Sequence, residues 1–145
     1  MSEVESFLSP KDEAEIVAAI QEAEKDTSGE IRVHLEYEDR GDPYRRAQEV
    51  FCLLKMDNTR HRNGVLLYIA VHTHHFVILG DRGIDRVVPP DFWNTTRDLI
   101  QEHFRKGDFR AGIVAGVLSA GRELKAHFPW RPDDQNELSD AISKN

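Results

Sequence analysis

Two short apolar runs decide the fold of this chain: Asn-Gly-Val-Leu-Leu-Tyr-Ile-Ala at residues 63–70 and Phe-Val-Ile-Leu-Gly-Asp-Arg-Gly-Ile at residues 76–84. Both runs contain β-branched residues, and a short polar connector separates them, so together they predict a β-hairpin. The second run stops at Gly80-Asp81. This stop places a carboxylate at the end of a strand.

An earlier segment, residues 30–37, alternates apolar and polar side chains with the period of a half-buried strand. A predicted helix follows it, and a strand, a helix and a second strand normally form a parallel, right-handed βαβ unit. If the hairpin is antiparallel, the strand ends at Glu30, Asn63 and Asp81 share one edge of the sheet. We call this edge, with the loops that enter it, the rim.

The predicted helices surround this sheet. A capping serine or aspartate followed by proline begins two of them, at Ser9-Pro10 and Asp42-Pro43. The apolar spacing predicts four main helices, at about residues 10–26, 43–56, 92–104 and 109–127. We expect a three-layer α/β/α sandwich with a small mixed sheet and helices on both faces. Residues 1–145 are expected to be a single domain, with 129–145 as a turn and short helix.

Composition narrows the range of partners. The 145 residues carry a formal net charge of −7, and no basic stripe is available to neutralise nucleic-acid phosphates. No apolar run approaches the roughly 20 residues that span a bilayer, and the acidic start of the chain differs from a secretory signal. We therefore expect a cytoplasmic protein with no nucleic-acid binding and no membrane insertion. Cations are the more natural partners.

The predicted rim gathers oxygen ligands. It offers Glu30, Asp81 and Asp85, and the connector between helix and strand adds Asp57 and Asn58. Carboxylate and amide oxygens suit hard cations such as Ca²⁺ or Mg²⁺. In the alternative interpretation, Asp81 only caps the turn that follows it, and Glu30 is a solvent-facing strand residue. Spacing alone leaves both interpretations open.

Basic and polar residues flank the same rim. Arg62, Asn63 and Arg82 could contact a phosphate group, because guanidinium binds phosphate through a planar fork. The arginines could equally neutralise surplus carboxylates. The histidines of His72-Thr73-His74-His75 lie at the hairpin connector, at the opposite edge of the sheet. A solvated turn is the preferred interpretation of that segment, and chelation of a transition metal is the alternative.

These motifs, in this order, resemble the TPM-domain family. The resemblance rests on residues 27–33, 63–67, 78–84 and 104–113, and extends over nearly the whole chain. It implies an α/β/α sandwich and, in at least some members, binding of a divalent cation. Plant thylakoid-lumen relatives are described as acid phosphatases, and other members help to assemble membrane complexes. The likeness is to a soluble bacterial branch without a signal peptide or membrane anchor.

Two functional hypotheses follow from the residues and the resemblance. The first is a non-catalytic domain that binds Ca²⁺ or Mg²⁺ at the rim and engages a protein partner. The alternative is a metal-dependent acid phosphatase acting on phosphomonoesters, in which Glu30, Asp81 and Asp85 hold the metal and Arg82 steadies the phosphate. The sequence shows no compelling nucleophile with an oriented base, so the first hypothesis is preferred.

Overall fold

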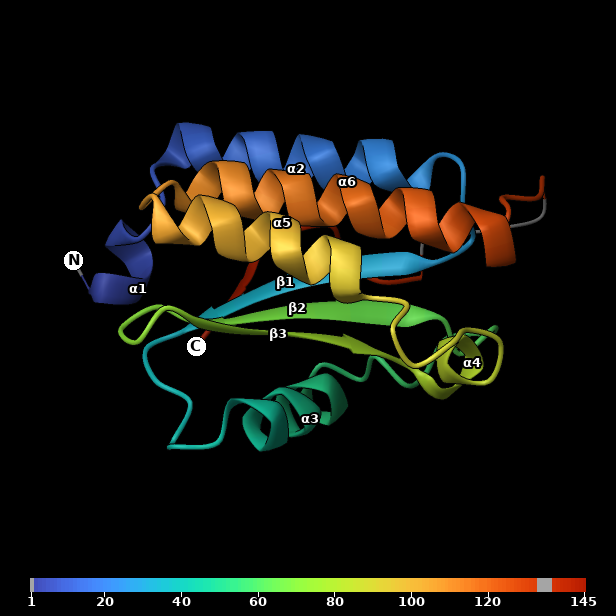
Figure 1. The fold of residues 1–145 in the computed structure, drawn as a ribbon, viewed down its shortest axis with the longest axis horizontal. Coiled ribbons are helices and arrows are strands. Elements are labelled where there is room, and N and C mark those ends of the chain that lie inside the picture. The colour runs from blue at the N-terminus through green and yellow to red at the C-terminus, as the bar shows by residue number, and fades with distance from the viewer. Residues whose placement is uncertain (1, 133–136) are drawn as a thin grey trace.

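A central mixed sheet separates two layers of helices in the computed structural model, which describes residues 2–132 and 137–145 (Figure 1). The strands are β1 (Glu30–Glu36), β2 (Gly64–Ala70), β3 (His75–Gly80) and β4 (Ser143–Lys144). The helices are α1 (Glu3–Ser6), α2 (Pro10–Glu24), α3 (Pro43–Leu53), α4 (Arg82–Asp85), α5 (Asn94–Arg105) and α6 (Phe109–His127). Helices α2, α5 and α6 cover one face of the sheet, and α3 covers the other. The predicted three-layer sandwich is confirmed.

The strand order is β3-β2-β1-β4. Strands β1 and β2 are parallel and β2 and β3 are antiparallel, as the sequence predicts. The chain end differs from the prediction: residues 137–145 contain no helix, and Ser143–Lys144 pair in parallel with β1 instead. The outer side of β1 offers unpaired backbone groups, and a short extended segment satisfies them. The end of the expected turn and the start of the expected helix, residues 133–136, lie outside the described residues.

Local signals place the helix starts. Ser9 and Asp12 form a reciprocal capping box at the start of α2, and Pro10 is its first residue. Asp42 caps α3 through the backbone N–H of Arg45 (3.1 Å). Because a cap satisfies backbone donors that the helix itself leaves unpaired, both predicted starts are confirmed to the residue.

Each face of the sheet carries its own apolar cluster. Towards α2 and α6 the cluster includes Ile20, Val33 and Leu124, which are completely buried. Towards α3 it includes Val50 and Leu66. Strand β2 is buried along its whole length because it contributes to both clusters. None of the helices in the described part of the chain is both long and apolar enough to cross a membrane.

Small residues let α6 approach α5 closely. A Cβ added to Gly112 would lie 2.7 Å from the Phe104 ring, and one added to Gly116 would lie 2.5 Å from Ile100. Both separations are shorter than van der Waals contact. The glycines of α6 therefore permit close packing against α5.

Candidate functional site

Backbone hydrogen bonds bring the three strand ends of the rim together. The Glu30 N–H donates to the Asn63 carbonyl (3.3 Å), and the Asp81 N–H donates to the Gly64 carbonyl (2.9 Å). Glu30 and Asp81 thus flank Gly64, about 10 Å apart at two strand spacings. Residues in register point to the same face of a sheet, and Gly64 has no side chain to separate them. The predicted convergence of distant segments at the rim is confirmed.

The carboxylate of Glu30 is buried and only half satisfied. The residue is 3% exposed, so the solvent-facing alternative is wrong. Its Oε1 accepts hydrogen bonds from the backbone N–H groups of Leu138 (2.7 Å) and Glu137, whereas its Oε2 is buried with no hydrogen-bond partner among the described residues. Burial raises the pKa of Glu30 to about 7, and the two backbone donors oppose that shift only in part.

Asp81 has the same half-satisfied character. Its Oδ1 caps α4 by accepting from the Arg82 N–H (2.7 Å), as the alternative interpretation predicted. Its Oδ2 is buried, and no residue in the described part of the chain forms a hydrogen bond with it. Asp85 is the last residue of α4 and is exposed as a whole. Partial burial of its carboxyl group, together with the charge of Asp81, raises its pKa. Capping therefore accounts for the position of Oδ1 of Asp81 but not for that of Oδ2.

A loop, residues 56–63, closes over the rim. A Cβ added to Gly64 would lie 3.2 Å from the Met56 carbonyl oxygen, and one added to Gly83 would lie 2.5 Å from that of Arg62. The Gly83 N–H donates to the same Arg62 carbonyl (2.8 Å). Thr59, in this loop, is 6% exposed, and its Oγ1 has no hydrogen-bond partner in the part of the chain that the structure describes. Sequence reasoning missed Thr59, whose only signal was a hydroxyl in the connector that enters the rim.

The other predicted residues of the rim differ in accessibility. Asp57, Asn58, Arg62 and Arg82 are exposed, whereas Asn63 is buried and donates from Nδ2 to Ser28 Oγ (3.2 Å). Asn63 therefore ties the loop to the start of β1.

Within residues 2–132 and 137–145, no three His, Cys, Asp or Glu side chains are grouped so that they could hold a metal ion by themselves. A cation at the rim would have to combine the two carboxylates of Glu30 and Asp81 with hydroxyl, carbonyl or water oxygens.

A further acid, Glu24, lies behind Glu30 at the end of α2. Its Oε2 accepts from the Ile31 N–H (2.9 Å). Burial and a hydrogen bond with Asp140 raise the pKa of Glu24 to about 9, so it is protonated at neutral pH. Glu24 therefore supports the strand as a neutral group and adds no charge to the rim.

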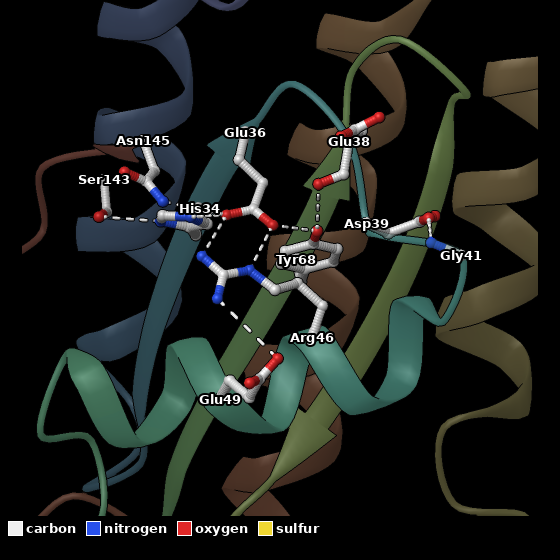
Figure 2. A network of polar contacts seen from close by, with 10 residues as sticks. All are labelled: His34, Glu36, Glu38, Asp39, Gly41, Arg46, Glu49, Tyr68, Ser143 and Asn145. Atoms are coloured by element: carbon white, nitrogen blue, oxygen red, sulfur yellow. Dashed lines mark hydrogen bonds and ion pairs between the residues drawn. The ribbon is translucent and has the colours of Figure 1, made fainter.

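A second buried polar cluster lies at the other end of β1, under α3 (Figure 2). Arg46 holds the carboxylate of Glu36 through two hydrogen bonds, Nε to Oε2 (2.7 Å) and Nη2 to Oε1 (3.0 Å). Tyr68 donates its hydroxyl to Oε2, and His34 Nε2 lies 3.2 Å from Oε1. Burial alone would raise the pKa of Glu36, but these partners outweigh it and lower the pKa to about 2. Burial lowers the pKa of His34, which is neutral at pH 7.

This cluster departs from the expectation of a half-buried strand. The alternating polar residues of 30–37 were expected on a solvated face, yet Glu30, His34 and Glu36 are all buried. The cause is α3, which covers that face with Val50 and Phe51. The signal was present, since the predicted helix at 43–56 had to lie on one face of the sheet.

The histidine connector is an exposed turn, as predicted. Its side chains have separate partners: His72 Nδ1 lies 3.2 Å from Glu3, and His75 Nδ1 lies 2.6 Å from Asp39. His74 packs against the ring of Phe109. Because each ring has a different partner, the histidines do not converge on one point.

Comparison with solved structures identifies a near relative and two distant ones. The BA42 protein from the psychrophilic bacterium Bizionia argentinensis is 53% identical, with a TM-score of 0.93 over 100% of both chains. An N-terminal domain from P. gingivalis is 19% identical, with a TM-score of 0.69 over 85% of this chain and 80% of that one. The N-terminal domain of cg2496 from Corynebacterium glutamicum is 14% identical, with a TM-score of 0.64 over 95% of this chain and 81% of that one. The two distant likenesses show the fold alone.

Comparison with curated proteins found no match. The family model for the TPM domain matches residues 2–123, which include β1, β2, β3 and every helix but the last turn of α6. The match thus takes in Glu30, Thr59 and Asp81. The chain belongs to the TPM-domain family.

Proposed function

We propose that the rim binds a divalent cation, Ca²⁺ or Mg²⁺, and that the domain acts as an interaction or assembly module. The observation that carries this proposal is a pair of buried carboxylate oxygens, Glu30 Oε2 and Asp81 Oδ2, that have no hydrogen-bond partner within residues 2–132 and 137–145. A buried acceptor without a donor is costly, and a buried charge more so. A bound cation would remove both costs.

The donor set agrees with the chemistry of a hard cation. Glu30 and Asp81 would supply charge, and Thr59 Oγ1, a third buried oxygen without a partner, would supply a neutral ligand. Ca²⁺ and Mg²⁺ readily combine carboxylates with hydroxyl, carbonyl and water oxygens. The exposed Asp57, Asn58 and Asp85 are accessible from solvent and could add outer ligands. The net charge of −7 also favours cations near the surface.

A binding role needs only ligands and a firm support, and the rim has both. Its backbone is held by strand pairing, by the loop at residues 56–63 and by the amides that the chain end donates to Glu30. A cation on Glu30 would act on the same carboxylate that anchors residues 137 and 138. Residues 137–145 lie at the surface, so cation binding at Glu30 could change the surface that a protein partner contacts.

A calcium titration followed by amide NMR tests the proposal. We expect saturable shifts centred on Glu30, Thr59 and Asp81, with magnesium competing at the same residues. Asp81→Asn should abolish these shifts, whereas Asp98→Asn, at an exposed site on α5, should leave them unchanged. If the amide signals of the rim do not shift at millimolar calcium and magnesium, or shift equally in Asp81→Asn, the proposal is refuted.

Phosphatase activity stays the alternative prediction. Arg62 and Arg82 are exposed beside the rim and are the residues that would contact a phosphate there. Turnover of p-nitrophenyl phosphate that requires the cation and falls about tenfold in Arg82→Gln would support catalysis. Cation binding with residual turnover that is equal in Asp81→Asn would support the non-catalytic role.

A further inference from the structure

Strand β3 forms an open edge of the sheet within the described part of the chain. The hydrogen bond from Asp81 N to Gly64 O marks residues 81 and 64 as a hydrogen-bonded antiparallel pair. Such pairs alternate along a ladder, so residues 79 and 77 also direct their backbone groups towards β2. The N–H and C=O groups of Phe76 and Ile78 then point away from the sheet, in the direction of an absent neighbour.

This edge lacks the usual protection against pairing. Proteins normally interrupt an exposed strand edge with lysine, proline or a bulge. Residues 75–80 read His-Phe-Val-Ile-Leu-Gly, and their register with β2 is continuous. Their side chains are exposed or only partly buried. The edge is therefore geometrically ready to accept another strand.

A groove runs beside this edge, between β3 and α5, with a volume of about 420 Å³. Phe76 and Phe104 give it an apolar floor, and their rings are 5.4 Å apart in an edge-to-face arrangement. Arg97, Gln101 and Arg105, one helical turn apart on α5, form its outer wall. None of the described residues that line the groove is acidic, although acids outnumber bases in the whole chain.

We propose that β3 and this groove bind an extended, acidic segment of a partner protein, which adds to the sheet as a strand beside β3. Its backbone would pair with the outward groups of Phe76 and Ile78. On the face of the added strand that points towards α5, an apolar side chain would lie against Phe76 and Phe104, and carboxylates two positions away would pair with Arg97 and Arg105. This surface is separate from the rim, and its use does not depend on the cation.

A second copy of this chain fits the edge less well. Pairing two β3 strands across a twofold axis would bring the arginines of both grooves to one junction, where like charges repel. Each copy also carries a net charge of −7. An acidic strand removes the first conflict, because its carboxylates meet Arg97 and Arg105 directly. Charge complementarity thus selects the segment of a partner over self-association.

A short capped peptide that carries Glu and Phe in turn on one strand face, with Thr at the intervening positions, serves as the probe. When the peptide is titrated into ¹⁵N-labelled protein at low salt, it should shift the amide signals of Phe76, Ile78 and Arg97. Its affinity should fall as salt is added. A peptide of the same charge with two adjacent prolines at its centre lacks central N–H groups for pairing in either orientation and should leave these amides unchanged. The same sequence with Lys in place of Glu should bind about tenfold more weakly or not at all.

Protein variants separate the groove from general charge. The double variant Arg97→Glu, Arg105→Glu should lower the affinity for the peptide about tenfold. The control double variant Arg122→Glu, Lys125→Glu, at two exposed positions on α6, should leave that affinity unchanged. Asp81→Asn, which removes a proposed cation ligand, should also leave peptide binding intact. Equal binding of the Lys peptide, shifts away from β3, no binding at millimolar peptide, or dimerisation through β3 would each overturn the proposal.

Discussion

Two buried glutamates on one strand meet opposite environments. Glu30 and Glu36 lie at the two ends of β1, on the same face, and both are less than 5% exposed. The carboxylate of Glu36 is held by Arg46, Tyr68 and His34, and its pKa falls to about 2. The carboxylate of Glu30 receives backbone N–H groups on one oxygen only, and its pKa rises to about 7. The strand is the same, so the difference comes from the partners.

The comparison shows what the rim lacks. At Glu36 the protein supplies its own cation, because Arg46 binds the carboxylate from α3. At Glu30 no described residue donates to Oε2, and Asp81 across Gly64 has a second such oxygen. The complete charge pair at Glu36 is a structural site, whereas the incomplete one at Glu30 is where the proposed cation would supply the missing charge.

Removing the guanidinium of Arg46, which is paired with Glu36, should have the largest effect on stability. Arg46→Met leaves a buried carboxylate without its charge partner and should lower the free energy of unfolding by about 3–5 kcal/mol. Urea denaturation measures this loss. Arg45→Met, at the exposed neighbour on α3, should cost no more than about 0.5 kcal/mol. Equal losses in the two variants would mean that Glu36 does not need Arg46.

The pH dependence of stability should show the same contrast. The pKa of Glu36 is about 2 in the folded protein, against an ordinary pKa of 4.5, so the unfolded chain binds more protons between these values. Its contribution, about 3 kcal/mol, is complete above pH 4.5 and is lost as pH falls through 2. Wild type and Glu36→Gln, compared by urea denaturation at each pH, should converge at the acidic end. A constant difference would contradict the pairing.

The support of the rim can be tested at Gly83. A Cβ at this position would lie 2.3 Å from the His61 carbonyl oxygen, which belongs to the backbone and cannot rotate away. Gly83→Ala should therefore cost about 1–3 kcal/mol and weaken cation binding, because the loop must move. Gly80→Ala, whose Cβ would make an ordinary 3.4 Å contact with Ile84, is the matched control. Similar stability of the two variants would show that the loop is free to shift.

The smallest effect is expected at Glu30 itself. Without divalent cation, Glu30→Gln keeps an acceptor for Leu138 and removes a costly charge, so stability should change by less than about 1 kcal/mol. Denaturation in chelator measures this change. With calcium present, wild type should become the more stable protein, because only it retains the ligand. A loss in chelator as large as that of Arg46→Met would show that Glu30 is already satisfied.

Much of the fold was predictable because its signals are local. Capping residues placed the starts of α2 and α3, and the apolar runs placed β2 and β3. The rim was predictable in outline because parallel and antiparallel pairing constrain which strand ends meet. Strand β4 was not, since two residues carry no periodic signal and pair only because the edge of β1 is open.

The candidate site was likewise predictable from the sequence only in part. Sequence order alone pointed to Glu30 and Asp81, but not to Thr59, whose burial depends on how the loop at residues 56–63 folds back. It also did not show that the chain end supplies two amides to Glu30, a contact across more than a hundred residues. Nor did it show that Glu36 is paired with a cationic side chain on α3, whereas no cationic side chain of the described residues donates to Glu30.

The amino-acid sequence by itself determined the elements, their pairing directions and the family, because these depend on caps, periodicity and turn chemistry along the chain. Only the tertiary structure decided which charges are buried with partners and which are buried without them. That decision depends on the three-dimensional placement of α3, the loop and the chain end around β1. Desolvation and hydrogen bonding act through space, so two glutamates six positions apart on one strand acquire opposite pKa shifts.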